Sequence, residues 1–179
     1  MHARPATVAD APAIAEIGRL AFPPTYAGSL DASVIGTVVE ALYTDEATAA
    51  GILDAEDQPD TRFLVVENDG RIEGFLHYDH LGEEPELHRI YLRPDMIGTG
   101  AGSALMRALH DGLPPGQRYV LLVAAANTRA ITFYRRHGLE IRDSVDGVEY
   151  YRTHMGVDIS PDAAPYPAYI MERGPAERS

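Results

Sequence analysis

Hydrophobic and polar residues along the chain follow two different periods, and the changes of period divide it into strands and helices. Short alternating or unbroken runs of β-branched and aromatic residues predict strands, whereas apolar residues three or four positions apart predict helices. Strands are expected at 2–7, 61–67, 71–79, 86–92, 117–125, 139–144, 148–157 and 168–173. Helices are expected at 11–22, 29–43, 45–53, 101–113 and 128–137.

Turn-forming residues set several of these boundaries. Pro23 and Pro24 are expected to end the first helix, because proline lacks the N–H group that a helix interior needs. Residues 68–70 (Asn-Asp-Gly) predict a tight hairpin between two strands. The run 117–125 is almost wholly apolar, which predicts a central strand buried on both faces. Because strands and helices do not alternate regularly in the first half, a plain doubly wound sheet is not expected.

A glycine-rich turn lies between the strand that begins at Glu86 and the helix 101–113. Gly98, Gly100 and Gly102 alternate there, so three positions lack a Cβ and leave the neighbouring N–H groups unshielded. Such a turn at the start of a helix presents free N–H groups at the positive end of the helix dipole, where a phosphate or diphosphate binds well. The alternative is a glycine turn that serves only the close packing of helix on sheet.

The turn departs from two common phosphate-binding patterns. No Lys-Ser/Thr pair follows the glycines, and Ser103 stands where the dinucleotide fingerprint has its third glycine. The segment instead resembles motif A of the GNAT N-acyltransferases, a strand followed by Gln/Arg-x-x-Gly-x-Gly/Ala and a helix. Gly100 and Gly102 fall on the two small positions, and Ile97 falls on the Gln/Arg position. Residues 127–139 (NTRAITFYRRHGL) resemble the N-x-x-A-x-x-F-Y-x-x-x-G-F segment of the same family.

The order of the expected elements is also similar to that of this family, so the resemblance covers nearly the whole chain. It implies one domain over 1–179, of the α/β (α+β) class, with a loose tail at 174–179. The implied fold is a mixed, largely antiparallel sheet of six to seven strands flanked by helices. It also implies acetyl-CoA as cosubstrate, and it places the helices 29–43 and 45–53 over the site of the acceptor.

For the cosubstrate, the resemblance implies that the diphosphate lies at the glycine turn and the pantetheine arm along the preceding strand. Tyr91 and Leu92 would bond the arm through their backbone groups, although ordinary sheet pairing is compatible with both residues. Asn127 would also contact the arm, and residue type alone predicts a helix cap there equally well. The implied cofactor-binding residues are Tyr91, Leu92, Ile97, Gly98, Thr99, Gly100, Ala101, Gly102, Ser103, Asn127, Tyr134 and Arg136.

Two of these positions depart from the family pattern. Ile97 offers no hydrogen bond to a phosphate, and Thr99 replaces a basic residue that is often found there. Two alternatives follow: the affinity for the cofactor is reduced, or Arg93 or Arg136 compensates for the missing contacts.

Amide formation needs a neutral amine, so a general base is expected near the thioester. Glu86 is the first candidate, because some family members carry a catalytic glutamate at that position. His88 is the second, because it points to the same side of the strand and titrates near neutrality when unperturbed. Glu84 is the third. Tyr134 lies where the family often has a tyrosine that protonates the leaving thiolate. The alternative for each candidate base is a solvated charge at the end of a strand. The alternative for Tyr134 is a tyrosine packed in the core.

Composition narrows the possible partners. The formal net charge of the 179 residues is -12 and the sequence pI is about 4.9, which disfavours nucleic acid and favours a cationic partner, although acidity also serves solubility alone. Cysteine is absent, so there is no disulfide and no thiol nucleophile. All 15 basic residues other than histidine are arginine. No membrane-spanning run or signal peptide is apparent, so a cytoplasmic protein is expected.

The seven histidines raise the question of a metal. His77 and His80 lie three apart in or near a strand and are expected to face opposite ways, and no set of ligands has zinc-like spacing. No metal site is therefore expected. A homodimer is compatible with the sequence.

These observations lead to three hypotheses. The first is an N-acetyltransferase that moves an acetyl group from acetyl-CoA to a primary amine of a small molecule or peptide by direct attack, with Glu86 or His88 as base and Tyr134 as acid. The second is a non-catalytic acyl-CoA-binding or sensor module, which the substitution at Ile97 favours. The third is a nucleotide-binding α/β protein.

Overall fold

The computed structural model describes residues 1–80, 83–154 and 157–174. Two of the sequence predictions extend beyond these residues: 155 and 156 belong to the strand expected at 148–157, and 175–179 belong to the expected tail. The strands are β1 His2–Pro5, β2 Arg62–Asn68, β3 Arg71–Asp79, β4 Glu86–Leu92, β5 Tyr119–Ala124, β6 Leu139–Asp146 and β7 Pro167–Arg173. The helices are α1 Ala11–Tyr26, α2 Ala32–Leu42, α3 Asp45–Asp57, α4 Ala101–Gly112, α5 Thr128–Arg136 and α6 Gly147–His154, with short 3-10 turns at Val8–Asp10 and Pro94–Met96.

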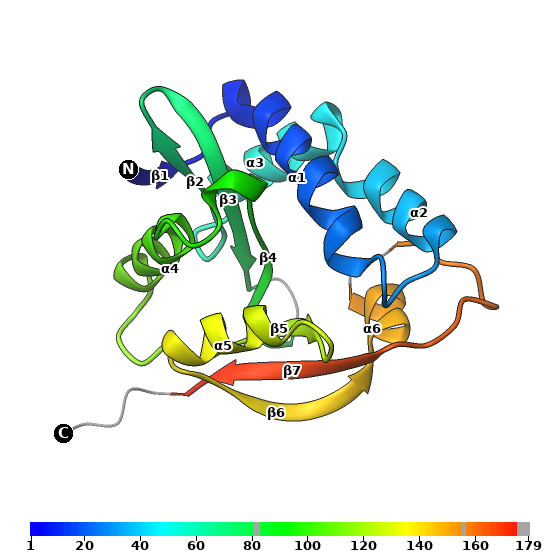
Figure 1. Cartoon of the computed structure of the whole chain (residues 1–179). Coiled ribbons are helices and arrows are strands. Elements are labelled where there is room, and N and C mark those ends of the chain that lie inside the picture. The colour runs from blue at the N-terminus through cyan, green and yellow to red at the C-terminus, as the bar shows by residue number, and fades with distance from the viewer. Residues whose placement is uncertain (81–82, 155–156, 175–179) are drawn as a thin grey trace.

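The strands form one seven-stranded sheet in the order β1-β2-β3-β4-β5-β7-β6. Neighbouring strands are antiparallel except for β4 and β5, which are parallel. The predicted mixed, largely antiparallel sheet flanked by helices is therefore confirmed. Figure 1 shows β1 to β4 in the upper part of the molecule and β5, β7 and β6 along its lower edge.

Helices cover both faces of the sheet, and each face has its own core. On one face α1, α2 and α3 pack together with α6 over a cluster rich in aromatic residues. On the other face α4 lies across β1 to β4, and its buried residues Leu105, Met106 and Leu109 join the second cluster. Apolar residues at helical spacing therefore fix α4 to the sheet, which holds the glycine turn at its N-terminus in place.

The sheet opens between β4 and β5. The two strands pair at a single position, Glu86 opposite Val120, and the Val120 N–H donates to the Pro85 carbonyl at 2.9 Å. Within the described residues, β4 beyond that position pairs only with β3, so the edge of β4 toward Leu92 has no strand partner there. Figure 1 shows β4 running away from β5 toward the turn that precedes α4. This opening, which we call the β4–β5 gap, exposes a row of backbone groups to whatever enters it.

A β-bulge interrupts β4 close to the point where the gap begins. Tyr78 pairs with Leu87 and His77 pairs with Arg89, so His88 is the extra residue on the β4 side. A bulge of this kind increases the local twist and redirects side chains. Here it brings His88 beside Glu86 and also turns Arg89 toward the face that α1 to α3 cover, where its guanidinium lies 5.7 Å from the centre of the Tyr43 ring.

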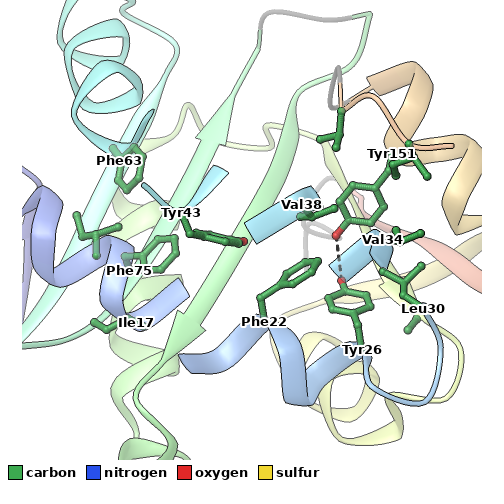
Figure 2. Packing of buried hydrophobic residues seen from close by; sticks show 14 of the residues in the cluster. Ile17, Phe22, Tyr26, Leu30, Val34, Val38, Tyr43, Phe63, Phe75 and Tyr151 are labelled. Carbon is green, nitrogen blue, oxygen red and sulfur yellow. Dashed lines mark hydrogen bonds between the residues drawn. The ribbon is translucent and has the colours of Figure 1, made fainter. Parts of the chain in front are cut away.

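An aromatic cluster fills the space beneath α1 and α2. Figure 2 shows Phe22, Tyr26 and Tyr43 together with Tyr151 from α6. The Tyr151 hydroxyl donates to the Tyr26 hydroxyl at 3.3 Å, and the rings of Phe22 and Tyr26 lie 4.5 Å apart. Tyr91 of β4 joins this cluster, since its ring centre lies 6.2 Å from that of Tyr43. The cluster therefore connects α6 to the first helix and to β4.

Two sequence predictions of secondary structure are wrong. The first helix continues through Pro23 and Pro24 to Tyr26, because Phe22 and Tyr26, four residues apart, are both buried in the aromatic cluster. This packing of two aromatic side chains outweighs the helix hydrogen bonds that the prolines cannot make. The Thr25 hydroxyl also donates to the Ala21 carbonyl at 2.7 Å in this last turn.

The segment expected as a strand at 148–157 instead begins as helix α6. The Asp146 side chain accepts a hydrogen bond from the Val148 N–H at 2.9 Å, which caps the helix. Val148 and Tyr151 are buried three residues apart, so helical spacing, not alternation, fits the core. Within the described residues no helix is long and apolar enough to cross a membrane.

Candidate active site

The glycine turn before α4 has the geometry of an open cradle. Gly98 and Gly100 have φ angles of +87° and +94°, which side-chain-bearing residues rarely adopt. A Cβ added at either position would meet no other atom within 4 Å, so both glycines face open space. No side chain caps α4, and its first N–H groups, those of residues 101–103, have no partner within the helix. The turn therefore presents unshielded donors at a helix N-terminus, which suits a diphosphate.

Gly102 and Ser103, unlike Gly98 and Gly100, lie against other parts of the protein. A Cβ on Gly102 would lie 3.2 Å from the Phe133 ring of α5, so this glycine allows α4 and α5 to approach closely. The Ser103 hydroxyl lies 3.1 Å from Nε2 of His137. The packing alternative thus holds for Gly102, while Gly98 and Gly100 remain free to serve a ligand.

The cations expected beside the turn differ in availability. Arg93 is buried, and its guanidinium contacts Glu16 at 2.6 Å and donates to the Ile72 carbonyl at 3.1 Å. A carboxylate far along the sequence therefore already pairs with its charge, and a role for Arg93 at the phosphate stays a prediction. Arg136 is exposed on α5. Ile97 is 42% exposed, and the Thr99 hydroxyl donates to the Met96 carbonyl.

The residues expected along the pantetheine arm lie on two sides of the gap. Tyr91 and Leu92 end β4, and the backbone of each pairs with β3 on one side only. Asn127 follows β5 and caps α5, because its side-chain oxygen accepts the Ala130 N–H at 3.1 Å. The cap reading of Asn127 therefore holds, and its side-chain NH2 group is still free to donate.

Tyr134 lies on α5, and its side chain is half-buried. Burial raises the pKa of Tyr134 above its usual 10, and the nearby phenols of Tyr26 and Tyr119 raise it further. Tyr26 belongs to the core cluster on one face of the sheet and Tyr119 to the cluster on the other. The phenol therefore stays protonated at neutral pH, in the form that donates a proton.

A cluster of acidic and imidazole side chains lies at the closed end of the gap, which is the end where Glu86 pairs with Val120. Asp79 ends β3 and Glu86 begins β4, directly opposite, and both are buried, with exposed fractions of 8% and 7%. His88 Nε2 lies 2.7 Å from Asp79 Oδ2, and its Nδ1 lies 3.5 Å from Glu86 Oε1. Neither nitrogen has an aligned hydrogen-bond acceptor, so we describe both contacts as ion pairs. The same-side prediction for Glu86 and His88 is consistent with this contact.

The electrostatics of the cluster separate its two imidazoles. Burial alone would lower the pKa of His88, but Asp79 and Glu86 outweigh it and raise that pKa to about 9. Burial, with the charges of Arg89 and His88, holds the pKa of His77 well below its usual 6.5. At neutral pH His88 is therefore an imidazolium and His77 is neutral. Because Arg89 can only donate, Nδ1 of His77, 3.0 Å from its guanidinium, accepts, and the His77 proton lies on Nε2.

Glu84, the third candidate base, lies outside this cluster. It is exposed, and its carboxylate contacts the Arg142 guanidinium at 2.8 Å. Three neighbours of the site were missed from the sequence: Asp79, Tyr150 and His137. The hairpin register could have identified Asp79, since it stands opposite Glu86. In the described parts of the chain no group of three or more His, Asp or Glu side chains is arranged to hold a metal ion.

The two parts of the site are joined by the length of β4. Seven residues at about 3.3 Å each put roughly 20 Å between the ends of the strand. The glycine turn follows one end, the buried acidic cluster lies at the other, and the gap runs between them. A ligand anchored by phosphates at the turn needs a long extended arm to bring a reactive group toward Glu86.

Comparison with known proteins agrees with this architecture. Residues 59–141 match the family model described as "Acetyltransferase (GNAT) domain". The structure superposes with a TM-score of 0.73 on the PaiA N-acetyltransferase of Thermoplasma acidophilum in complex with coenzyme A, at 22% identity, covering 97% of this chain and 98% of that one. It superposes equally well, at 0.73, on a ribosomal-protein-alanine N-acetyltransferase from Brucella melitensis, at 19% identity, covering 97% and 99%.

Curated relatives match over varying lengths. A spermidine N(1)-acetyltransferase of Thermoplasma acidophilum is 24% identical over 82% of this chain and 92% of its own length. An N-acetyltransferase of Methanocaldococcus jannaschii is 36% identical over 48% of this chain, and a mycothiol acetyltransferase of Clavibacter sepedonicus is 36% identical over 52%. The matched regions span only 42% and 31% of those two relatives.

The fold is that of the N-acetyltransferase structures on which this chain superposes. Over residues 59–141 the chain is similar to the GNAT acetyltransferase family. The family resemblance and the fold predicted from the sequence are both confirmed. The roles of individual site residues stay predictions.

Proposed function

We propose that the protein is an N-acetyltransferase that moves an acetyl group from acetyl-CoA to a primary amine by direct attack. The observation that carries this proposal is the β4–β5 gap, which joins a diphosphate cradle at one end to a buried acidic cluster at the other. A thioester carrier with a long arm fits that geometry. ATP or NAD carries its reactive centre much nearer its phosphates, so neither uses the length of the gap.

Acetyl-CoA supplies the activated acyl group, and the protein supplies position and proton transfer. The N–H groups of Gly98 and of residues 100–103 bind the diphosphate, and Arg136, which is exposed on α5, adds a positive charge. The gap edge of β4 at Tyr91 and Leu92, together with Asn127, holds the arm. These roles rest on the family resemblance and on the positive φ angles of Gly98 and Gly100.

The proton steps use Glu86, in the buried acidic cluster, and Tyr134 of α5. The amine attacks the thioester carbonyl, its nitrogen loses a proton to Glu86, and the carbon–sulfur bond breaks. Tyr134 protonates the leaving thiolate. The raised pKa of His88 supports Glu86 over His88 as the group that accepts the proton. Both nitrogens of an imidazolium already carry protons, so the ring has no free lone pair with which to accept another.

For the acceptor we propose a small cationic amine such as a polyamine, with a peptide amine as the alternative. The acidity of the chain, at a formal net charge of -12, supports a cationic substrate. A relative named for spermidine acetylation aligns over most of both chains, and structural neighbours named for acetylation of ribosomal-protein alanine support the peptide alternative.

The decisive experiment measures release of CoA thiol from acetyl-CoA with a panel of amines. We expect release with at least one cationic amine, and about a hundredfold lower kcat for Glu86→Gln and about tenfold lower for Tyr134→Phe, with the KM for acetyl-CoA little changed in both. Matched controls are Glu140→Gln, an exposed carboxylate, and Tyr169→Phe, a tyrosine of β7 outside the site.

A binding measurement separates the rival functions. Thermal unfolding is compared with acetyl-CoA, NAD and ATP present in turn. Stabilisation by acetyl-CoA alone supports the proposal; stabilisation by acetyl-CoA without thiol release from any amine indicates the acyl-CoA sensor. Stabilisation by NAD or ATP in its place points to the nucleotide-binding alternative.

A further inference from the structure

Asp79 is a buried carboxylate in the closed end of the gap to which neither the family resemblance nor the proposed reaction gives a role. It ends β3 and faces Glu86 across the register of the hairpin that leads into β4. The bulge at His88 places an imidazole between the two carboxylates, with Asp79 the closer of them at 2.7 Å, against 3.5 Å to Glu86. The three side chains therefore form one continuous charged unit.

We propose that Asp79 is a positioning residue of the catalytic base: it holds His88 as a fixed imidazolium beside Glu86, so that Glu86 stays oriented to accept the proton of the amine. This inference rests on the proposed acetyl transfer. It assigns the three groups different tasks, since Glu86 exchanges the proton, His88 keeps its own proton throughout, and Asp79 never meets the substrate.

The physical reason is the cost of burying two carboxylates side by side. Like charges in a buried site repel each other strongly. One imidazolium between the two carboxylates reduces this repulsion and holds both side chains in place. The contact with Asp79 at 2.7 Å holds the ring by Nε2, while Nδ1 lies 3.5 Å from Glu86 Oε1.

The other charged and titratable groups around His88 are consistent with this arrangement. From β3, the His77 ring lies 5.3 Å from the His88 ring and is neutral. From β4, Arg89 contacts His77 and not His88. From α6, Tyr150 faces Glu86, whose charge, after burial, raises the pKa of that phenol and keeps it protonated. Among these neighbours only the two carboxylates favour the charged imidazole, and for that reason the pKa of His88 lies near 9.

The proton balance of the reaction fits this division of tasks. The amine nitrogen forms its bond to the acyl carbon and gives one proton to Glu86, while the carbon–sulfur bond breaks and the thiolate takes a proton from Tyr134. Glu86 then returns its proton to solvent and Tyr134 regains one, so the sum is amine plus acetyl-CoA giving amide plus CoA thiol. His88 and Asp79 end each cycle unchanged.

The test follows His88 by NMR in wild type and in Asp79→Asn, a change of nearly the same shape that removes the charge and turns one carboxylate oxygen into an NH2 group. The His88 ring signals are assigned by their absence in His88→Gln. We expect the His88 titration midpoint near 9 in wild type to fall by about one unit or more in Asp79→Asn, since its nearest carboxylate is gone. Asp54→Asn, an exposed aspartate of α3, serves as control and leaves the midpoint in place.

The second readout is the pH profile of kcat at saturating amine. If the imidazolium is required, kcat of wild type falls on the alkaline side near pH 9, and in Asp79→Asn that fall moves to lower pH by the same amount as the NMR midpoint. A purely structural role for Asp79 would lower kcat equally at all pH values and leave the alkaline limb where it was. That result, or an unchanged His88 midpoint, overturns the proposal.

Failure of this inference and failure of the proposed function give different results. The NMR titration needs no turnover, so a protein that never acetylates an amine still shows whether Asp79 controls His88. Thermal unfolding of Asp79→Asn at pH 6 checks that the variant is folded. If Asp79→Asn is unfolded, Asp79→Glu takes its place, because it keeps the charge. In Asp79→Glu, a His88 titration midpoint equal to that of wild type, together with a shifted alkaline limb of the kcat profile, also contradicts the proposal.

Discussion

Three glycines that look alike in the sequence have different structural requirements. Gly98 and Gly100 have positive φ angles and open space around them, whereas Gly102 has an ordinary helical backbone and lies against Phe133. A sequence pattern cannot separate these cases, because the first depends on the backbone path and the second on a residue 31 positions away. Only Gly98 and Gly100 are expected to bear directly on cofactor binding.

Gly100→Ala tests this distinction. We expect it to destabilise the fold by about 1–2 kcal/mol, because an L-residue at φ +94° is strained. We also expect a higher KM for acetyl-CoA, because the new methyl group projects into the cradle. Chemical denaturation and steady-state kinetics measure the two effects.

The control for this variant is Gly36→Ala on α2, where an added Cβ meets no atom within 4 Å and no positive φ angle is required. Because alanine is the better helix former, this change should stabilise the protein by about 0.5–1 kcal/mol and leave the KM unaltered. Equal effects of the two changes on KM would contradict an anion cradle at Gly100.

His88 also sets a pH dependence of stability. Its pKa is about 9 in the folded protein and near 6.5 in the unfolded chain, so folding binds a proton between these values. The stabilisation is complete below pH 6.5 and is lost as pH rises through 9, with a maximum of about 3 kcal/mol for a shift of this size. Denaturant titrations of wild type between pH 6 and 10 should show this decline, and His88→Gln should show a flatter profile. A parallel profile in His88→Gln would mean that another group is responsible.

At the scale of secondary-structure elements, most of the chain could be predicted from periodicity. The strands β2 and β3 with their hairpin, the helix α4, and the apolar strand β5 all lie within a few residues of their expected bounds. Each of these elements has a strong local signal: alternation, an Asn-Asp-Gly turn, or apolar residues at helical spacing. The arrangement of Asp79, Glu86 and His88 could not be predicted, because it depends on a bulge and on the register of two strands.

The two wrong predictions have the same cause. β-branched and aromatic residues at 148–157 favour a strand and prolines favour a break, but in both segments contacts with distant elements decide the outcome. Tyr151 of α6 bonds Tyr26 of α1, so the two misassigned segments in fact stabilise each other. Local propensity is a weak guide when aromatic side chains from separate parts of the sequence share one core.

Asp146→Ala is expected to destabilise α6. The Asp146 carboxylate accepts the Val148 N–H at 2.9 Å and lies 3.3 Å from the Tyr166 nitrogen, so the change leaves two backbone donors without that partner. A loss of about 1–2 kcal/mol follows from the magnitude of helix caps. Denaturant unfolding measures it, with Asp158→Ala, an exposed loop aspartate, as the matched change. A difference below about 0.5 kcal/mol between the two variants would show that the cap contributes little.

At the scale of the whole molecule, the sheet consists of two halves, and the candidate site lies between them. β1 to β4 with α4 form the half that carries the glycine turn, and β5, β7 and β6 form the other half, with α5 and Tyr134. One pairing position, Glu86 opposite Val120, joins the halves between β4 and β5. The site therefore lies where the sheet has fewest hydrogen bonds between strands, which is also where an extended ligand can bond to the exposed strand edge.

The overall charge of the molecule leads to opposite salt effects for the two proposed substrates. At a formal net charge of -12 the protein attracts a polyamine and repels the negatively charged acetyl-CoA, and both effects are screened as the Debye length shortens. Between about 20 and 300 mM NaCl, kcat/KM for a trivalent polyamine should fall several-fold, while kcat/KM for acetyl-CoA should stay level or rise. A monovalent amine is the internal comparison and should show a weaker decline, because the attraction scales with charge. If the polyamine and the monoamine respond equally, the surface charge serves solubility alone, and the choice of acceptor has to come from contacts inside the gap.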